Sequence, residues 1–386
     1  MSSRPLRLII DGPCVSHGLR HAIKLNADDG RPTGVLMGWI KTLSRLDEMF
    51  HPDEIVVAWE TEERSWRYRR YPEYKGTRIA QRKRQTELEQ QELKEFFQIQ
   101  MPDTIKALYH IGILQIAVPG LEADDILGLV TEFPREKDST QHIVVSTDKD
   151  MLQLARYDSV RIYNTYADKM YHQRRDGKLV VNGRENCILA PSPDTYLLWR
   201  TIIGDTSDSL PGIPGVGQKT VEHLYGFLPF KTKDWGTKDI EKYLTSVELN
   251  GKRGQAILDG TDRILRNVEL MRLSYEAIPY ELLSDSARTF VKCFDRNDTT
   301  SSFMLSHVST KYPLFLRYTK RDPSPMLNFF RKRGFDFAYK PIYWNQFVTK
   351  FRCLFDRRNR MLERRYNQNI RPVPIGYKKH NWEIVP

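Results

Sequence analysis

GDTSDSLPGIPGVGQKT, residues 204–220, places two carboxylates three residues apart directly before a glycine-rich turn. Asp205 and Asp208 can face one hard divalent cation, because such ions prefer carboxylate oxygens and residues at i and i+3 share a face. The turn lacks side chains at three positions, so backbone N–H groups ahead of the helix expected from about Gln218 can approach an anion. The residues of this expected phosphate cradle are Gly212, Gly215, Gly217, Lys219 and Thr220. Metal ligands beside a phosphate cradle indicate a protein that handles a phosphodiester.

Each half of this stretch also has an ordinary interpretation. An isolated Asp-x-x-Asp is more often a solvated cap than a metal site. The glycine-rich half is harder to explain as a plain loop. It is not a Walker P-loop either, because Gly217-Gln218-Lys219-Thr220 lacks the Gly-Lys-Thr adjacency of that motif.

The chain has 386 residues and a formal net charge of +11, which predicts two or three domains and an acidic partner. The positive charge is concentrated between residues 317 and 379, where 17 Lys and Arg stand against 4 Asp and Glu. Four widely spaced cysteines form no Cys-x-x-Cys pair, which argues against a zinc site or a disulfide framework. Without a signal peptide or a run of 18 apolar residues, we expect a soluble, cytoplasmic protein with no membrane span.

Carboxylates follow the apolar segments that are typical of buried strands, expected at 6–10, 55–59, 114–118 and 142–147. In open parallel α/β sheets, ligands collect outside the carboxyl ends of the strands. Each acid taken alone could equally well belong to a turn or cap a helix. Taken together, they predict an acidic, metal-binding rim at one edge of the sheet. Its members are Asp11, Glu60, Glu122, Asp124, Asp125, Asp148, Asp150, Asp205 and Asp208. Because like charges repel, two Mg²⁺ or Mn²⁺ roughly 4 Å apart would neutralise the rim, activate a water and stabilise a leaving oxygen.

Residues 64–84 carry nine basic side chains that only Glu73 opposes. The aromatic residues interleaved with them are Trp66, Tyr68, Tyr71 and Tyr74. Basic groups can follow phosphates while aromatic faces stack on unpaired bases, so this composition is typical of a single-strand-binding groove. The alternative is a solvated helix face, which seldom carries so many large aromatics. We therefore expect this segment to bind nucleic acid, with Arg67 and Tyr74 among the contacts.

In their order, these elements resemble the 5′ nuclease family: the flap endonucleases, the 5′-3′ exonuclease domain of bacterial DNA polymerase I and their phage relatives. The resemblance covers roughly residues 6–280 and stops after about Ala287. Besides the opening stretch, the matching segments are Ile10-Asp11-Gly12, Gly30 to Gly34, Ser65-Trp66-Arg67, Tyr74-Lys75-Gly76-Thr77-Arg78, Gly120 to Asp125, Ser146 to Met151 and Gln153-Leu154.

The resemblance implies an α/β fold: a PIN-like nuclease core with a central, mostly parallel sheet, a helical arch or gateway, and an α-helical helix-three-turn-helix DNA-binding domain. We place the core at 1–192 with the arch at about 61–101, the helix-three-turn-helix domain at 193–287, and a basic extension of unknown role at 288–386.

The resemblance also implies roles for single residues. It assigns to the first metal cluster Asp11, Glu60, Glu122, Asp124 and Asp125, and to the second Asp148, Asp150, Asp205 and Asp208. Lys75 and Arg78 match the catalytic gateway residues that contact the scissile phosphate. Residues 212–220 match the module that grips duplex DNA, often with a bound K⁺.

Glu60 departs from the family pattern, which has Asp at that position. Glutamate keeps the charge but reaches one methylene further, so we expect a small shift of the first metal or a preference for Mn²⁺, with activity retained. Helices are expected at 193–203 and at 252–273. A further basic, amphipathic helix is expected at 345–366, where it either packs on the core or adds salt-dependent DNA affinity.

The sequence therefore predicts a structure-specific 5′ nuclease that hydrolyses phosphodiesters at 5′ ends or flaps of DNA. The expected substrates carry a 5′ flap, a 5′ overhang or a nick, and RNA primers in RNA–DNA hybrids are a further option. We expect a monomer that works with a separate polymerase, in the host cytoplasm if the protein is viral. The alternatives are a PIN-type RNase and an inactive DNA-binding protein, although a pure binder gains nothing from a negative rim that faces phosphates.

Overall fold

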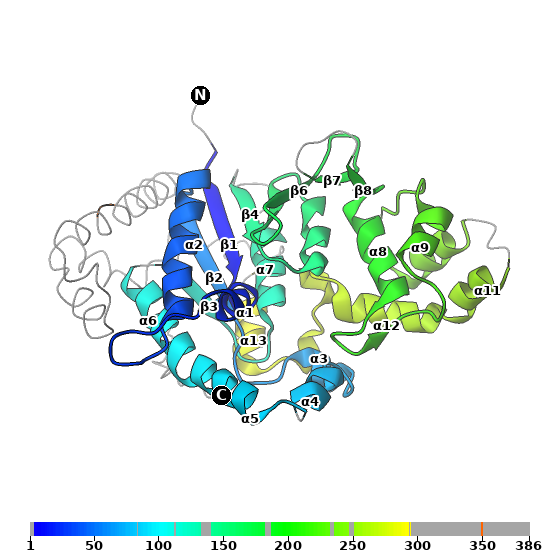
Figure 1. Cartoon of the computed structure of the whole chain (residues 1–386). Coiled ribbons are helices and arrows are strands. Elements are labelled where there is room, and N and C mark those ends of the chain that lie inside the picture. Colours follow the sequence, from blue (N-terminus) through cyan, green and yellow to red (C-terminus); the bar gives the residue numbers. More distant parts are fainter. Residues whose placement is uncertain are drawn as a thin grey trace.

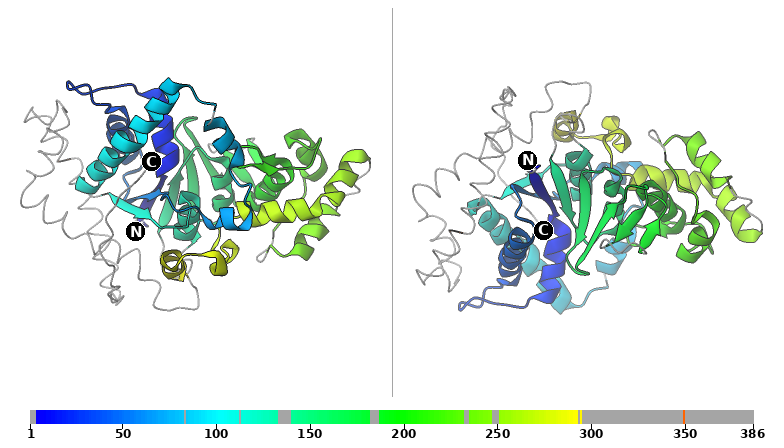
Figure 2. Two further views of the ribbon diagram at one scale, coloured as in Figure 1. Left: turned by 90° about the horizontal axis from the view of Figure 1, so that it is seen from below. Right: turned by 90° about the horizontal axis from the view of Figure 1, so that it is seen from above.

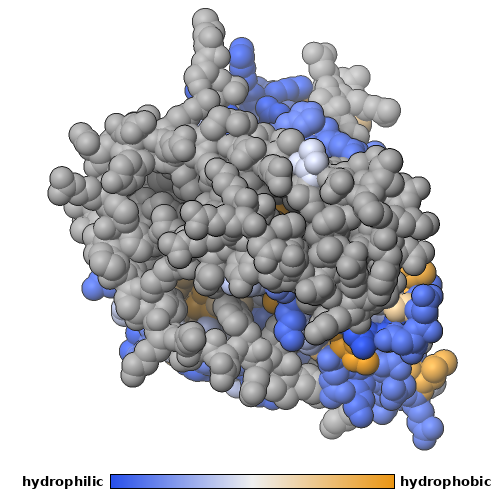
Figure 3. All heavy atoms as spheres, turned by 90° about the vertical axis from the view of Figure 1, so that its left-hand side faces the viewer, coloured by the Kyte–Doolittle hydropathy of each residue, from blue (hydrophilic) through white to orange (hydrophobic). Residues whose placement is uncertain are grey.

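A computed structural model of the chain shows a twisted sheet with helices on both faces and a helical part beside it (Figure 1). The structure describes residues 4–292, 294 and 349, apart from 83, 112, 133–139, 182–186, 232–234 and 247–250. The helix predicted at 345–366 and nearly all of the extension at 288–386 lie outside these described residues. On one face, the described side chains that are visible are mostly hydrophilic, with a few apolar ones between them (Figure 3). No helix in the described part is long and apolar enough to cross a membrane.

Five parallel strands form the main part of the sheet. β1 (Leu6–Asp11) lies between β2 (Glu54–Trp59) and β4 (Gln141–Val145), and β3 (Leu114–Ala117) and β5 (Val160–Asn164) flank these. The side chains of β1 alternate, because Leu8 and Ile10 pack in one buried cluster and Ile9 packs in the other. Helices that cover both faces account for this two-sided burial. The prediction of a mostly parallel central sheet is confirmed.

Three antiparallel strands extend the sheet at one edge, and the sequence did not predict them. They are β6 (Lys169–Gln173), β7 (Leu179–Val181) and β8 (Ile188–Ala190), in the order β5-β6-β7-β8. The side chains of β6 are only partly buried or exposed, and β7 and β8 have three residues each. No long apolar run marks such strands, so only their pairing with the rest of the sheet reveals them.

Two layers of helices cover the sheet (Figure 2). One layer contains α1 (Gly12–Ala22), α2 (Gly34–Phe50) and α6 (Met101–His110), whose buried side chains form one hydrophobic cluster with the sheet. The other layer contains α7 (Ala123–Glu132) and the 3-10 helix η2 (Lys149–Arg156). The carboxyl ends of β1, β2 and β4 therefore open at one edge of the sheet, between the two layers.

The segment between β2 and α6 lies below this edge in Figure 1. It contains α3 (Trp66–Arg70), α4 (Gly76–Arg82), α5 (Glu87–Glu95) and the π-helix η1 (Phe96–Gln100). This segment is therefore a series of short helices and not one continuous helix. α5 starts afresh at Thr86, which forms a capping box with Glu89.

The helical part begins with α8 (Pro193–Ile203), which has the predicted bounds because Ser192 caps it and Pro193 occupies its first turn. The elements that follow are the hairpin of β9 (Gly204–Asp205) and β10 (Leu210–Pro211), then α9 (Gln218–Tyr225), α10 (Thr237–Leu244), α11 (Lys252–Asp259), α12 (Thr261–Met271), the 3-10 turns η3 (Tyr275–Ala277) and η4 (Tyr280–Leu282), and α13 (Asp285–Lys292). The helix expected at 252–273 is two helices that meet at Gly260, where a Cβ would lie 2.2 Å from Ile213 Cδ1.

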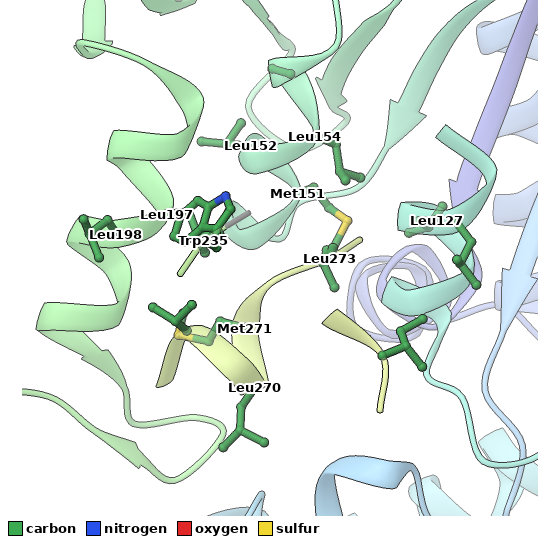
Figure 4. Close-up of a cluster of buried hydrophobic side chains, with 14 of the residues drawn as sticks. Leu127, Met151, Leu152, Leu154, Leu197, Leu198, Trp235, Leu270, Met271 and Leu273 are labelled. Carbon is green, nitrogen blue, oxygen red and sulfur yellow. The ribbon is translucent and has the colours of Figure 1, made fainter. Parts of the chain in front are cut away.

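One hydrophobic cluster joins the sheet layer to the helical part. Leu127 of α7, Met151 of η2, Leu197 of α8 and Leu270 and Met271 of α12 belong to it (Figure 4). Polar contacts strengthen the same junction, because the side chain of Gln153 donates to the carbonyl of Met271 at 2.9 Å and accepts the N–H of Leu273 at 2.7 Å. The end of α12 is thereby fixed beside the carboxyl end of β4. The domain boundary at 192/193 stays a prediction.

Candidate active site

The first group of acids meets where β1 and β2 end. Asp11 is the last residue of β1 and caps α1, since its Oδ1 accepts the backbone N–H of Cys14 at 3.0 Å. Its Oδ2 accepts the hydroxyl of Ser146 at 2.8 Å, which ties β1 to the end of β4. Glu60 directly follows β2, and Asp124 lies in the first turn of α7, which packs against both strands.

Glu122 is the most strongly held acid of this group. It precedes α7, is 5% exposed, and accepts hydrogen bonds from the hydroxyl of Ser65 at 2.8 Å and that of Tyr74 at 3.0 Å. Lys75 Nζ lies 3.0 Å from its Oε1. Burial alone would raise the pKa of Glu122, but the cations of Lys75 and Arg67 hold it down at about 2. Glu122 is therefore a fixed negative charge in the folded protein.

The second group of acids lies between the end of β4 and the β9–β10 hairpin. Asp148 caps η2 by accepting the N–H of Asp150 at 2.8 Å. Arg200, in the last turn of α8, joins the two ends of the group: its Nε donates to Asp150 at 3.1 Å and its Nη2 to Asp205 at 2.8 Å. Asp208, in the turn after Asp205, accepts from a guanidinium nitrogen of Arg78 at 2.6 Å.

The two groups interact with each other. The hydroxyl of Tyr74 lies 3.0 Å from Oε2 of Glu122 and 3.1 Å from Oδ2 of Asp208, so one side chain touches both. Burial raises the pKa of Asp11 to about 6, and the charge of Asp148 in the other group adds to the rise. Burial and Asp148 likewise raise the pKa of Asp150 to about 7, although Arg200 opposes this.

The rim fits divalent cations in charge and in ligand type. Burial, together with Asp11 and Asp148, raises the pKa of Asp124 well above the ordinary aspartate range, and bound cations would relieve such repulsion. All the donors are carboxylate oxygens, which Mg²⁺ and Mn²⁺ favour. Within the described ranges, no three His, Cys, Asp or Glu side chains already form a metal cage. The protein's own cations lie among the acids instead, at Lys75, Arg78 and Arg200.

Asp125 was expected to face a metal, but its carboxylate pairs with Arg67 in the interior. Both of its side-chain oxygens accept from the guanidinium of Arg67 at 2.8 Å, and the residue is 2% exposed. One oxygen also accepts the backbone N–H of Glu122 at 3.0 Å. Its carboxylate therefore holds Glu122 and the start of α7 in place, one step behind the rim.

Arg67 and Tyr74 are not the surface contacts that the sequence suggested. Arg67 is 2% exposed and also donates to the carbonyl of Leu270 at 2.7 Å, while Tyr74 is 3% exposed. Trp66 beside them is 1% exposed, so it cannot stack on a base in this arrangement. α3 packs against the start of α7 and the end of α12, and its first two residues, Trp66 and Arg67, fill that junction. Arg69 and Arg70 of the same helix are exposed.

Lys75 and Arg78 do lie at the rim. Lys75 has a positive φ of 55°, and its Nζ lies 3.0 Å from Glu122 and 4.0 Å from Glu60. Arg78 is half exposed and pairs with Asp208. Each residue therefore presents a cation next to one of the two acid groups.

The glycine-rich turn divides into a structural part and an open part. A Cβ on Gly212 would lie 1.9 Å from the carbonyl oxygen of Ile203, so this glycine serves the packing of the turn against α8. Gly215, with φ 75°, and Gly217 have no atom near the place of a Cβ, and no side chain caps the start of α9. Lys219 is exposed and Thr220 is partly buried in this first turn. The open N–H groups and Lys219 form the part that suits an anion.

Three residues that hold the rim were missed from the sequence. Ser65 and Ser146 each donate to a rim carboxylate, and both stand in segments that match the family motifs. Arg200 is the one basic residue of α8, among mostly buried neighbours, which is a usable signal for a carboxylate partner.

Comparison with known proteins places these features in context. The family model for the N-terminal, resolvase-like domain of 5′-3′ exonucleases matches residues 7–181. A 5′-3′ exonuclease of Mycobacterium tuberculosis is 30% identical over 246 residues, which cover 63% of this chain and 76% of the relative. A 5′-3′ exonuclease of Buchnera aphidicola subsp. Schizaphis graminum is 27% identical over 209 residues, 52% of this chain and 62% of the relative. The thermostable DNA polymerase I of Thermus aquaticus is 26% identical over 271 residues, 70% of this chain but 28% of the polymerase.

Two solved structures share the fold. A bacteriophage T5 5′-exonuclease with bound divalent metal ions (zinc) aligns with a TM-score of 0.57 at 20% identity, over 75% of this chain and 98% of that chain. A bacteriophage T5 flap endonuclease, in a pseudo-enzyme-product complex with DNA and metal ions, aligns with the same score and identity over 75% and 97%. At this identity the likeness establishes the fold, and it confirms the predicted PIN-like α/β core.

Proposed function

This chain belongs to the 5′-3′ exonuclease family, and on that premise we propose that it is a structure-specific 5′ nuclease. Its substrate is DNA with a 5′ flap, a 5′ overhang or a nick, and the reaction is hydrolysis of a phosphodiester to a 5′-phosphate product. The observation that carries the proposal is the convergence of eight carboxylates and three cations, Lys75, Arg78 and Arg200, at the edge where β1, β2 and β4 end. Activity, substrate and partners are proposals, because the chain spans 62% of the Buchnera relative and 28% of the polymerase.

The carboxylates hold two divalent cations in this proposal. The first group comprises Asp11, Glu60, Glu122 and Asp124, and the second comprises Asp148, Asp150, Asp205 and Asp208. When bound, Mg²⁺ or Mn²⁺ supplies the charge that activates a water and stabilises the leaving oxygen. Asp125 positions Glu122, and Arg200 bridges Asp150 and Asp205 and so fixes their spacing.

Lys75 and Arg78 contact the scissile phosphate and stabilise the charge that develops on it. Two ion pairs support this role, because Lys75 lies beside the first acid group and Arg78 lies beside the second. A phosphate bound between the two groups would lie near both side chains. Removal of either cation should therefore lower turnover more than it lowers DNA binding.

The open part of the glycine-rich turn, with Gly215, Gly217, Lys219 and Thr220, grips the phosphates of duplex DNA next to the rim. Backbone N–H groups at the start of a helix suit this task because they carry partial positive charge. We assign this grip to a helix-three-turn-helix domain at 193–287, beside a nuclease core at 1–192 with an arch at 61–101. A K⁺ bound at the turn, a monomeric state and a separate polymerase partner belong to the same proposal.

The test is cleavage of a 5′-labelled flap duplex with Mg²⁺, with Mn²⁺ and with EDTA, together with a blunt duplex and a flap made of RNA. We expect cleavage near the flap junction that requires either metal. Lys75→Ala should slow it by on the order of 10²-fold, as the loss of one transition-state donor does. Lys41→Ala, which removes an exposed cation on α2, is the control and should retain the wild-type rate.

Three results would contradict the proposal or change it. Cleavage in EDTA would show that the reaction needs no metal. A cleavage rate of Lys75→Ala equal to that of wild type would show that Lys75 has no catalytic role. Cleavage of the RNA flap alone would move the protein to the PIN-type RNases. DNA binding without cleavage in either metal would leave an inactive binder of the same fold.

A further inference from the structure

Two segments of chain that are about 130 positions apart lie against each other at the rim. The backbone N–H of Lys75 donates to the carbonyl of Asp208 at 2.9 Å, and the backbone N–H of Thr77 donates to the hydroxyl of Ser209 at 2.9 Å. Arg78 Nε reaches the carbonyl of Ser207 at 3.3 Å. Residues 75–78, which carry both phosphate-contacting cations, are thereby fastened to the turn that carries the second acid group.

Thr77 and Ser209 form the centre of this junction, and their protons fit in one consistent pattern. The hydroxyl of Ser209 accepts from Thr77 N–H, and its own proton can go to Thr77 Oγ1 at 3.1 Å. The hydroxyl of Thr77 then donates to the carbonyl of Thr206 at 3.1 Å. Each hydroxyl thus donates once and accepts once, so the two side chains act as a unit.

The backbone on both sides of the junction is strained. Lys75 has φ 55° and Ser209 has φ 59°, in the left-handed region that residues with a Cβ seldom adopt. Such conformations persist only where the surroundings hold them, and they gather at functional sites. The hydrogen bonds across the junction accompany this conformation of Lys75, whose Nζ lies 3.0 Å from Glu122.

We propose that Thr77 and Ser209 are positioning residues that hold Lys75 and Arg78 over the two acid groups. The hydrogen bonds described for the two hydroxyls go to each other and to backbone groups and not to a rim carboxylate, so the proposed effect on the reaction passes through the two cations. This inference rests on the proposed nuclease function. It gives a role to two residues that the acids and cations of the rim do not point to. The segments that carry these two residues meet only in the folded chain.

The experiment compares single-turnover cleavage of the flap duplex in Mg²⁺ with DNA affinity measured in Ca²⁺, for five variants. They are Thr77→Val, Thr77→Ser, Ser209→Ala, the double variant Thr77→Val/Ser209→Ala, and Thr245→Val. Thr77→Val and Ser209→Ala should each slow cleavage by on the order of 10-fold and change affinity by about 2-fold or less, because each removes two hydrogen bonds. Thr77→Ser keeps the hydroxyl and should restore the rate.

The double variant should be no slower than the slower single variant, since both substitutions break the same contact. Thr245→Val removes a hydroxyl that donates to the carbonyls of Glu241 and Lys242 in α10, and it should cleave like wild type. Thermal unfolding of each variant checks the fold; should Thr77→Val not fold, Ser209→Ala alone carries the same comparison.

The inference is overturned if Thr77→Val cleaves at the wild-type rate, if Thr77→Ser fails to restore a lost rate, or if the two single effects add. It is also overturned if affinity falls as much as the rate. Its failure is distinguishable from that of the proposed function: a wild-type chain that cleaves nothing refutes both. A wild-type chain that cleaves, with Lys75→Ala slow and Thr77→Val fast, refutes only the positioning role.

Discussion

The guanidinium of Arg67 lies in the interior, bound to both oxygens of Asp125 and to the carbonyl of Leu270. Arg67→Met should therefore lower the free energy of unfolding by about 3–5 kcal/mol, because it leaves the buried Asp125 carboxylate without its partner. The measurement is urea denaturation. Arg64→Met, at an exposed position of the same segment, is the control and should change stability by about 0.5 kcal/mol or less. Equal losses for the two variants would contradict the interior placement.

Variants of Glu60 test whether glutamate can act as a metal ligand at the position where the family has aspartate. The side chain of Glu60 is 45% exposed and lies 4.0 Å from Lys75 Nζ, so space remains for a ligand that adjusts. We expect Glu60→Asp to change the cleavage rate by about 3-fold or less, and Glu60→Gln to lower it by on the order of 10-fold or more. Flap cleavage in Mg²⁺ and in Mn²⁺ measures both variants. A wild-type chain that is inactive until Glu60→Asp restores it would contradict this account.

At the scale of elements, the hairpin between α8 and α9 depends on one close approach of backbones. Gly204 has φ 81°, and a Cβ there would lie 2.2 Å from the backbone nitrogen of Gly212. Gly204→Ala should destabilise the protein by about 3 kcal/mol or more, since it adds a clash with backbone to the cost of a positive φ. Gly215→Ala is the matched control, with φ 75° but open space, and should cost about 1 kcal/mol.

Thermal or urea unfolding of the two glycine variants measures the difference. Similar losses would mean that the close approach of Gly204 to Gly212 is not needed for the fold. In that case Asp205 and Asp208 would not be held in place by the glycine contact.

The elements also show what sequence can and cannot predict. Asp11, Asp148 and the strands before them were predictable, because apolar runs mark parallel strands and their carboxyl ends share one edge. β6 was not, because its half-exposed side chains carry no such signal. The burial of Arg67 was missed since composition does not tell a surface cation from one paired with Asp125 through the fold.

Contacts between distant segments are a second limit. Thr77 and Ser209 are ordinary polar residues, and no sequence pattern near either of them indicates that they are in contact. Their hydrogen bond exists because α8 and the β9–β10 hairpin are placed beside the segment that follows α3. Local pattern therefore gives the acids of the site, while the residues that orient its cations require the three-dimensional structure.

At the scale of the whole molecule, the crowded rim should make stability depend on pH and on metal. Burial and neighbouring acids raise the pKa of Asp11 to about 6 and that of Asp150 to about 7 in the folded chain. The folded state therefore binds more protons than the unfolded state between about pH 4 and pH 7, and stability falls as pH rises through that window. Cations replace these protons, so added Mg²⁺ should raise the melting temperature more at pH 8 than at pH 5.

Differential scanning calorimetry in EDTA and in Mg²⁺ measures this dependence. Asp11→Asn/Asp150→Asn is the control, because it removes two of the titrating groups and should flatten the fall of stability with pH. A metal-free melting temperature that rises from pH 5 to pH 7, or a larger metal increment at pH 5, would contradict the proposed rim.

In the proposed mechanism, the two acid groups act together in phosphodiester hydrolysis. The most direct measurement is single-turnover cleavage of a 5′-labelled flap duplex by Asp148→Asn/Asp205→Asn, beside wild type, at protein concentrations that saturate binding for both. We expect the double variant to bind the duplex and to lose metal-dependent cleavage, while wild type releases a product cut near the flap junction. Cleavage by the double variant at the wild-type rate would contradict the account.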